Sequence, residues 1–331
     1  MRWAIRSLLL ARLALAVAPG RAQGAPPPAQ HARIAGQDYV RVTDWAKANS
    51  LAAQWLKPNE WLQLTNRSTR ILLAVNHRET RINGSEVWLL FPLVLHNGSP
   101  YLAQLDTQTT LQPILAPPKN RPGAKIKTVC LDPGHGGKDP GNQAATNQEK
   151  SYTLLLAHEV HVQLVRAGLK VVLTRSTDTF IDLPTRPEIA RRRRADLLVS
   201  LHFNAADGSR DTAQGAEAYC LTPAGASSTN ARGEGGGAGA FPGNRCNDKN
   251  LYLTYLVQKA LTRNLGVEDR GVRRARFAVL RDAVMPATLI EAGFMSHPLE
   301  GRKVLTPAYR QKIARAIVEG VLAYKRQVER P

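Results

Sequence analysis

The sequence has few acidic residues, few cysteines and, beyond its first thirty residues, no long hydrophobic run. Its 331 residues include 45 Lys and Arg against 26 Asp and Glu, a formal net charge of +19. No later apolar run approaches the roughly 20 residues that a membrane-spanning helix needs, so no integral membrane segment is expected once an N-terminal signal is removed. Hydrophobic residues make up 43% and charged residues 21%, which excludes a mostly disordered or collagen-like chain. The length favours two domains, and the positive charge indicates anionic surroundings or an anionic partner.

Only three cysteines are present. Cys130 lies in an apolar, strand-like segment, where we expect it to be a small buried hydrophobic residue. Cys220 and Cys246 flank a segment rich in glycine, alanine and serine, 222–245, and could form a disulfide in an oxidising compartment. Two unpaired thiols are the alternative.

Residues 1–25 predict an export signal. Arg2 and Arg6 precede an apolar stretch, 8–18, and small residues follow it at 20–22. Arg12 interrupts the apolar stretch, and a retained N-terminal helix is the alternative. No cysteine follows the stretch, so a lipid-anchored form is not expected. We therefore expect an exported protein of the periplasm or cell envelope.

Residues 33–115 predict a small α+β accessory domain. Short apolar runs occur at 61–64 and 71–75, and a short helix is expected from Thr43. The pairs Asn83-Gly84 and Asn97-Gly98 are typical of tight hairpins. The spacing of these pairs and Tyr101 resembles the module first described at the N-terminus of copper amine oxidases, although nothing here suggests copper binding. Residues 116–125, rich in proline, predict a linker.

From residue 126 to about 327 the pattern alternates between strands and helices. We expect strands at 126–131, 169–174, 197–201, 277–280 and 287–290, and helices at 149–166, 184–194, 249–264 and 307–326. Continuous apolar strands separated by helices indicate an α/β domain, with a mostly parallel sheet flanked by helices on both faces. Ligands of such sheets bind beyond the carboxyl ends of the strands.

Three of these strand ends carry residues that can do chemistry. The first strand leads to His135 in a glycine-rich loop, the strand ending at Leu201 delivers His202, and the strand ending at Ile290 delivers Glu291. The glycines allow a sharp turn that leaves room for the imidazole. A phosphate-binding loop is the competing interpretation, but the glycine spacing fits neither the dinucleotide fingerprint nor the P-loop.

Glu149 is the predicted third metal ligand. It begins the helix after the first strand and would complete a set of two histidines and one glutamate, which leaves an open zinc position for water. Its alternative role is that of a helix cap. Glu291, among apolar neighbours, is then the expected general acid/base that takes a proton from the zinc-bound water; a salt bridge to an arginine is the alternative.

These residues lie in motifs that resemble the third family of zinc-dependent N-acetylmuramoyl-L-alanine amidases, over residues 126–325. The matching segments are Leu131-Asp132-Pro133-Gly134-His135-Gly136-Gly137, Val172-Leu173-Thr174-Arg175, Ser200-Leu201-His202-Phe203-Asn204-Ala205, Asp269-Arg270-Gly271-Val272, Val279-Leu280-Arg281 and Leu289-Ile290-Glu291-Ala292-Gly293-Phe294.

The resemblance implies Zn²⁺ on His135, Glu149 and His202, with Glu291 as catalytic acid/base. It further implies substrate contacts by Asn204 and Arg270, and hydrolysis of the amide between N-acetylmuramic acid and L-alanine in peptidoglycan. Some members of this family carry a helix that blocks the zinc cleft. Here the many glycines of 222–247 argue against such a helix, and no activating protein can be named.

Other motifs are weaker. His158 and His161 are three residues apart, whereas the zincin helix needs a spacing of four. Four consecutive arginines, 191–194, point in different directions from a helix, so nucleic-acid binding is not expected. The alternatives for function are another exported zinc peptidase acting on wall stem peptides and a non-catalytic wall-binding protein.

Overall fold

The computed structural model describes residues 29–144, 146–206, 208, 212–230 and 239–330. The predicted export signal, residues 1–25, and residues 231–238 of the glycine-rich segment 222–247 lie outside the described residues. In the part of the chain that the structure describes, no helix combines the length and apolar character needed to cross a membrane.

The N-terminal module, residues 31–115, consists of small antiparallel sheets and short helices. Its strands are β1 (His31–Ile34), β2 (Gln37–Arg41), β3 (Ala52–Lys57), β4 (Trp61–Thr65), β5 (Arg70–Ala74), β6 (Glu79–Ile82), β7 (Ser85–Trp88), β8 (Val94–His96) and β9 (Ser99–Ala103). Its helical segments are α1 (Val42–Ala48), α2 (Gln104–Asp106), the π-helical turn η1 (Thr107–Leu111) and α3 (Gln112–Leu115).

The Asn-Gly pairs form the two hairpins that the sequence predicts. Asn83 and Gly84 connect β6 to β7, and Asn97 and Gly98 connect β8 to β9; all four have positive φ, at 51°, 87°, 49° and 72°. Two consecutive positive φ angles match the right-handed twist of the flanking strands. The predicted helix is α1, which begins one residue before Thr43.

The second part of the chain is the predicted α/β domain. Its strands are β10 (Thr128–Pro133), β11 (Gln143–Ala144), β12 (Asn147–Gln148), β13 (Lys170–Leu173), β14 (Leu197–Asn204), β15 (Ala216–Leu221), β16 (Asp269–Ala275) and β17 (Ala287–Phe294). Its helices are α4 (Glu149–Arg166), α5 (Thr185–Arg192), η2 (Pro242–Cys246), α6 (Asn247–Leu265), α7 (Ala278–Arg281), α8 (Pro298–Val304) and α9 (Pro307–Val328).

The mostly parallel sheet is confirmed. Strands β13, β10, β14 and β17 are adjacent and parallel, β15 is antiparallel to β17, and β16 is parallel to β15. The prediction of a strand at 277–280 is wrong, because this segment forms the short helix α7. The backbone N–H groups of Leu280 and Arg281 donate to the carbonyl of Phe277. A four-residue apolar run does not distinguish a strand from a helical turn.

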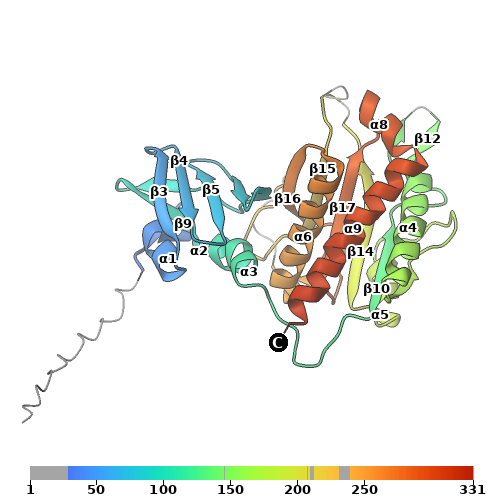
Figure 1. Cartoon of the computed structure of the whole chain (residues 1–331), viewed down its shortest axis with the longest axis horizontal. Coiled ribbons are helices and arrows are strands. Elements are labelled where there is room, and N and C mark those ends of the chain that lie inside the picture. The colour runs from blue at the N-terminus through green and yellow to red at the C-terminus, as the bar shows by residue number, and fades with distance from the viewer. Residues whose placement is uncertain (1–28, 145, 207, 209–211, 231–238, 331) are drawn as a thin grey trace, which may run out of the picture.

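The two faces of this sheet are covered unequally. Alternate strand residues enter different cores: Val129 and Leu131 join the larger core with α4, α6 and α9, whereas Cys130 and Leu198 join a smaller core with residues of α5 and α7. In Figure 1 the long helices α4, α6 and α9 lie side by side in front of the sheet. On the other face the described residues include those of the short helices α5 and α7, which also line a cavity there with His202 and Glu291.

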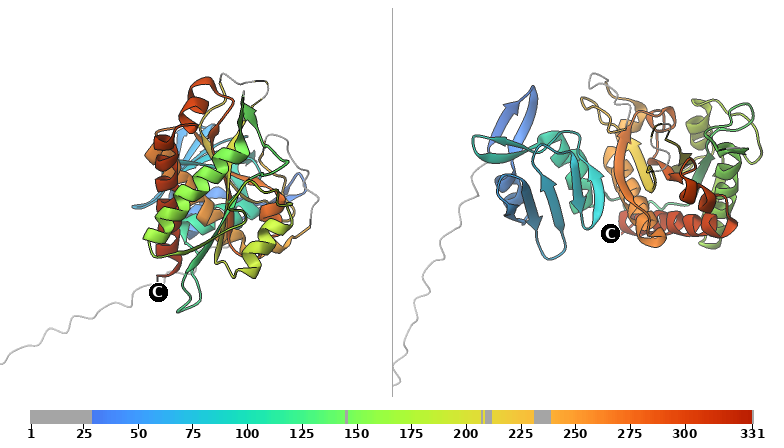
Figure 2. Two further views of the ribbon diagram at one scale, coloured as in Figure 1. Left: turned by 90° about the vertical axis from the view of Figure 1, so that its right-hand side faces the viewer. Right: turned by 90° about the horizontal axis from the view of Figure 1, so that it is seen from above.

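The sheet does not stop at the boundary between the two parts. Strand β7 of the module pairs in parallel with β16 through Val87 and Val272, so that eleven strands form one sheet. The larger core likewise includes Leu111 and Ile114 of the module together with Leu251 of α6. Figure 2 shows the module beside β16 when the molecule is seen from above. The predicted linker, 116–125, leads from α3 towards β10 without a helix or strand.

Asp106 makes the stability of the module depend on pH. Its buried carboxylate accepts hydrogen bonds from the backbone of Leu90 (2.8 Å) and Phe91 (2.9 Å) and from the Thr110 hydroxyl (2.9 Å). Burial nevertheless raises the pKa of Asp106 from 3.8 to about 6. Between these values the unfolded chain loses its proton while the folded chain keeps it.

The free energy of unfolding contributed by Asp106 should therefore fall by up to about 3 kcal/mol as the pH rises from about 4 to 6. Denaturant unfolding of the wild-type protein and of Asp106→Asn across this range measures the difference. The variant should lack this part of the slope, and equal slopes in both proteins would contradict the assignment.

Candidate metal centre

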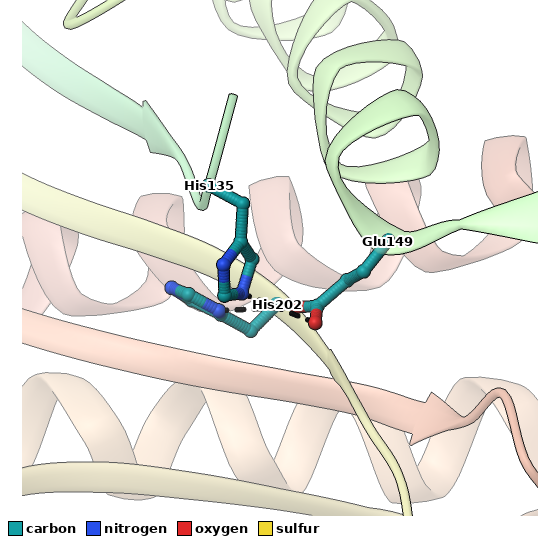
Figure 3. A group of neighbouring side chains, drawn as sticks. All are labelled: His135, Glu149 and His202. Carbon is teal, nitrogen blue, oxygen red and sulfur yellow. Dashed lines mark hydrogen bonds and ion pairs between the residues drawn. The ribbon is translucent and has the colours of Figure 1, made fainter. Parts of the chain in front are cut away.

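Three side chains from three elements meet at the carboxyl edge of the sheet (Figure 3). His135 follows β10, Glu149 is the first residue of α4, and His202 lies in β14. One potential ligand atom of each residue lies within 4.8 Å of the others. These three side chains could therefore hold a metal ion together. The structure therefore brings together the three ligands that the sequence predicts.

The carboxylate of Glu149 lies at the centre of the group. It is only 1% exposed, and its two oxygens face one imidazole each, Oε2 at 3.1 Å from Nε2 of His135 and Oε1 at 3.1 Å from Nδ1 of His202. The backbone N–H groups of Asn142 (2.9 Å) and Phe203 (3.0 Å) also donate to it. Burial opposes ionisation, but the two imidazoles outweigh it and hold the pKa of Glu149 well below its usual range.

His135 is oriented by its own loop. Its Nδ1 lies 2.9 Å from Oδ2 of Asp139, which leaves Nε2 facing Glu149. Burial lowers the pKa of His135, but the neighbouring Glu149 and Asp139 outweigh that effect and raise it. A carboxylate behind a ligating histidine fixes the ring and its tautomer. The backbone of His135 has a φ of +61°, unusual for a residue other than glycine.

Two glycines leave the space that the group occupies. A Cβ atom on Gly134 would lie 2.2 Å from the ring of His202. A Cβ atom on Gly141 would lie 2.6 Å from the ring of His135 and 2.7 Å from the Glu149 carboxylate. Real Cβ atoms do not approach other atoms so closely, so any larger residue here would displace a member of the group.

A buried ion pair holds the loop that carries His135. Asp132 and Arg186 are 1% and 2% exposed and lie 2.9 Å apart. Arg186 also donates to the carbonyls of Pro133 and His135. Burial raises the pKa of Asp132, yet Arg186 and two hydroxyl donors outweigh it and lower the pKa. The sequence analysis did not assign a role to Arg186, because an arginine beside a proline in a helix carries no distinctive signal.

Glu291 lies on the neighbouring strand at the level of the group. It is the β17 partner of His202, and both residues line the same cavity of about 570 Å³. Its Oε2 is buried without a hydrogen-bond partner among the described residues. Burial, together with the negative charges of Glu149 and Glu217, raises the pKa of Glu291 well above its ordinary value. Such a group can change its protonation within a cavity that also contains potential metal ligands.

The comparisons with known proteins agree with this geometry. The family model described as N-acetylmuramoyl-L-alanine amidase matches residues 129–323. The chain belongs to this family. It is 36% identical over 259 residues to the amidase AmiA of Escherichia coli, and this match covers 71% of this chain and 88% of AmiA. It is also 36% identical over 249 residues to the amidase AmiC of Neisseria meningitidis, over 69% of this chain and 58% of AmiC.

Solved structures of amidases show the same fold. The N-acetylmuramoyl-L-alanine amidase of Clostridium difficile 630 superposes with a TM-score of 0.52 at 33% identity, over 61% of this chain and 97% of that protein. AmiC2 of Nostoc punctiforme gives a TM-score of 0.51 at 32% identity, over 61% and 98%. Because these proteins are covered almost completely, the shared fold is the α/β domain. The chain is therefore an enzyme of the amidase type.

The two residues predicted to contact substrate, Asn204 and Arg270, converge on a third residue in this amidase. Asn204 Nδ2 donates to Oε1 of Glu217 at 2.8 Å, and Arg270 Nε lies 3.4 Å from its Oε2. Their contact with substrate stays a prediction. Glu217 was not among the predicted site residues. Like Glu291, it is an acidic residue within an otherwise apolar strand, and this pattern could have identified it.

The predicted disulfide is not formed. Cys220 and Cys246 are free thiols, as is Cys130. The sulfur of Cys220 faces the carbonyl of Arg273 and that of Cys246 faces the carbonyl of Val284. Cys220 is fully buried within β15, whereas Cys246 ends the turn η2, and their sulfurs point at different carbonyls. Flanking the same loop was not sufficient to bring them together.

Replacing Gly141 tests whether the three side chains act as one metal site. We expect Gly141→Ala to lower the affinity for a divalent metal ion at least about tenfold, because the new methyl group displaces His135 or Glu149. Metal titration of the purified protein measures this affinity. Gly168→Ala is the matched control, since Gly168 also has positive φ (+82°) but has no atom within 4 Å of an added Cβ. Equal affinities in both variants would exclude the assignment.

Proposed function

We propose that this amidase hydrolyses the amide bond between the lactyl group of N-acetylmuramic acid and L-alanine in peptidoglycan. Membership of the amidase family supports the reaction, and the arrangement of His135, Glu149 and His202 around one point supports a metal-dependent mechanism. The relatives are named as amidases of this bond, and a substrate in the cell wall requires export of the protein. The observation that carries the proposal is the placement of Glu291 beside the three potential ligands in one cavity.

The donor set suits zinc. Two imidazole nitrogens and one carboxylate are the ligands of many catalytic zinc sites, and the carboxylate here is buried with both oxygens directed at the imidazoles. His135, Glu149 and His202 would hold the ion. When bound, Zn²⁺ supplies a Lewis acid that polarises the substrate carbonyl and favours deprotonation of water.

Glu291 provides the proton transfers. Its carboxylate accepts a proton as the oxygen of a water molecule attacks the carbonyl carbon. The carbon–nitrogen bond then breaks, and Glu291 donates that proton to the nitrogen of the departing L-alanine. The products are a free lactyl carboxylate and a peptide with a free amino group. Oε2 of Glu291 has no hydrogen-bond partner in the part of the chain that the structure describes, which supports this role.

The surrounding residues keep these groups in position. Asp139 holds the ring of His135, and the pair of Asp132 and Arg186 holds the loop from which that ring projects. Apolar side chains flank the cavity: Phe180 and Leu183 remain 39% and 59% exposed at its margin. Charged and apolar side chains therefore line the same cavity, in which the amide bond would be placed.

Glu291→Gln separates catalysis from metal binding. The variant should retain bound zinc while its kcat on purified muropeptides falls by about 10²–10⁴-fold, because the amide cannot exchange the proton. Steady-state kinetics and metal analysis of the same preparation measure the two effects. Wild-type turnover by Glu291→Gln would remove Glu291 from the mechanism.

Removal of the metal tests the requirement for zinc. A chelator should abolish cleavage, and added zinc should restore it. The variant His202→Ala should hold no zinc at micromolar free metal, because two protein ligands bind the ion too weakly. Mass spectrometry of muropeptides digested with and without chelator identifies the bond that is cut. Undiminished cleavage in the chelator would contradict the metal site, and cleavage within the stem peptide would instead identify a peptidase.

A further inference from the structure

Strand β16 lies between the catalytic site and the N-terminal module. On one side it pairs with β15, and on the other with β7 of the module. Further contacts cross the same boundary: the backbone of Glu86 donates to Asp269 (2.9 Å), and the Tyr255 hydroxyl donates to the Ile82 carbonyl (3.2 Å). The module is thus continuous with the catalytic sheet.

Two consecutive arginines of β16 extend in different directions from this boundary. Arg274 is completely buried, and its guanidinium donates to the carbonyl of Leu221 in β15 (3.2 Å) and to that of Thr109 in the module (2.7 Å). A buried guanidinium without acceptors is strongly unfavourable. Because one of its acceptors comes from η1, Arg274 requires the module to be docked.

Arg273 connects the module to the catalytic site. Its Cζ lies 4.2 Å from the centre of the Trp88 ring in β7, and its Nε lies 3.1 Å from Oε2 of Glu217. The ring of Trp88 is also packed against β16, since a Cβ on Gly271 would lie 3.0 Å from its Cδ1. The side chain of Arg273 therefore contacts both an aromatic ring of the module and a carboxylate of the catalytic domain, and it also donates to the carbonyls of Arg270 (3.0 Å) and Thr229 (3.0 Å).

Glu217 in turn belongs to the row of residues that contains the active-site groups. Cross-strand pairing places His202 beside Glu291 and Glu291 beside Glu217. Directly paired residues project from the same face of a sheet. The carboxylate of Glu217 is 3% exposed and accepts hydrogen bonds from Asn204 (2.8 Å) and Tyr219 (2.7 Å).

We propose that the N-terminal module is a positioning element of the catalytic site: Trp88 orients Arg273, Arg273 orients the carboxylate of Glu217 beside Glu291, and Glu217 holds Asn204. This inference rests on the proposed function. It assigns Trp88, Arg273 and Glu217 as positioning residues, and it predicts an effect on turnover that a module joined only by a flexible linker would not have. Trp88 is not among the residues that line the cavity, so the proposal predicts little effect of Trp88 on KM.

The first experiment compares three full-length variants on soluble muropeptides. Trp88→Ala should lower kcat about three- to tenfold with little change in KM, because loss of the ring removes the contact with the module that positions Arg273. Trp88→Phe keeps an aromatic face and should restore kcat to within about twofold of wild type. Trp61→Ala removes an exposed tryptophan of the same module, 43% exposed, and should leave kcat unchanged. Wild-type kcat in Trp88→Ala would overturn the proposal.

A double-mutant cycle then tests the route through Glu217. In the Glu217→Gln background, Trp88→Ala should lower kcat by less than about twofold, since its effect has already been lost. Multiplicative effects for Trp88 and Glu217 would refute the connection.

Failure of this inference can be distinguished from failure of the proposed function. The cycle compares ratios of turnover, which retain their meaning whichever group transfers the proton and whichever bond is cut. Thermal unfolding and metal content are measured for every variant. If Glu217→Gln does not fold, the comparison of Trp88→Ala, Trp88→Phe and Trp61→Ala still tests the role of the Trp88 ring. An equal loss of kcat in Trp88→Ala and Trp88→Phe would contradict that role.

Discussion

The negative charge of Glu149, buried between two imidazoles, is the constraint on which the site depends. A carboxylate that is 1% exposed must have partners for both oxygens, and His135 and His202 provide them at 3.1 Å each. The rings can approach only because Gly134 and Gly141 lack side chains. Three elements distant in sequence are thereby fixed around one point, which is the requirement for binding a metal ion.

The unequal covering of the sheet explains why this point is accessible. The long helices α4, α6 and α9 cover one face, whereas residues of the short helices α5 and α7 pack on the other and line the cavity together with His202 and Glu291. The row formed by His202, Glu291 and Glu217 projects from that second face. The cavity is thus lined both by His202 and Glu291 of this row and by apolar side chains such as Phe180 and Leu183.

The continuity of the sheet changes the role expected for the N-terminal module. A proline-rich connection such as 116–125 suggests two independent domains, yet eleven strands form one sheet and the buried guanidinium of Arg274 draws its acceptors from both parts. Without the module, the guanidinium of Arg274 would lose the Thr109 carbonyl as an acceptor. The module is therefore better regarded as part of the structure that supports the catalytic site.

The sequence by itself determined the α/β class, the hairpins of the module, four of the long or central helices and the residues of the candidate metal site, because periodicity, Asn-Gly pairs and glycine-flanked strand ends are local signals. It misplaced residues 277–280 and suggested a bridge between Cys220 and Cys246 that the structure lacks. Only the tertiary structure decided that Glu217 lies beside Glu291, that Arg186 supports Asp132, and that the module joins β16. These relations depend on strand order and on contacts between distant segments, which no local pattern in the chain encodes.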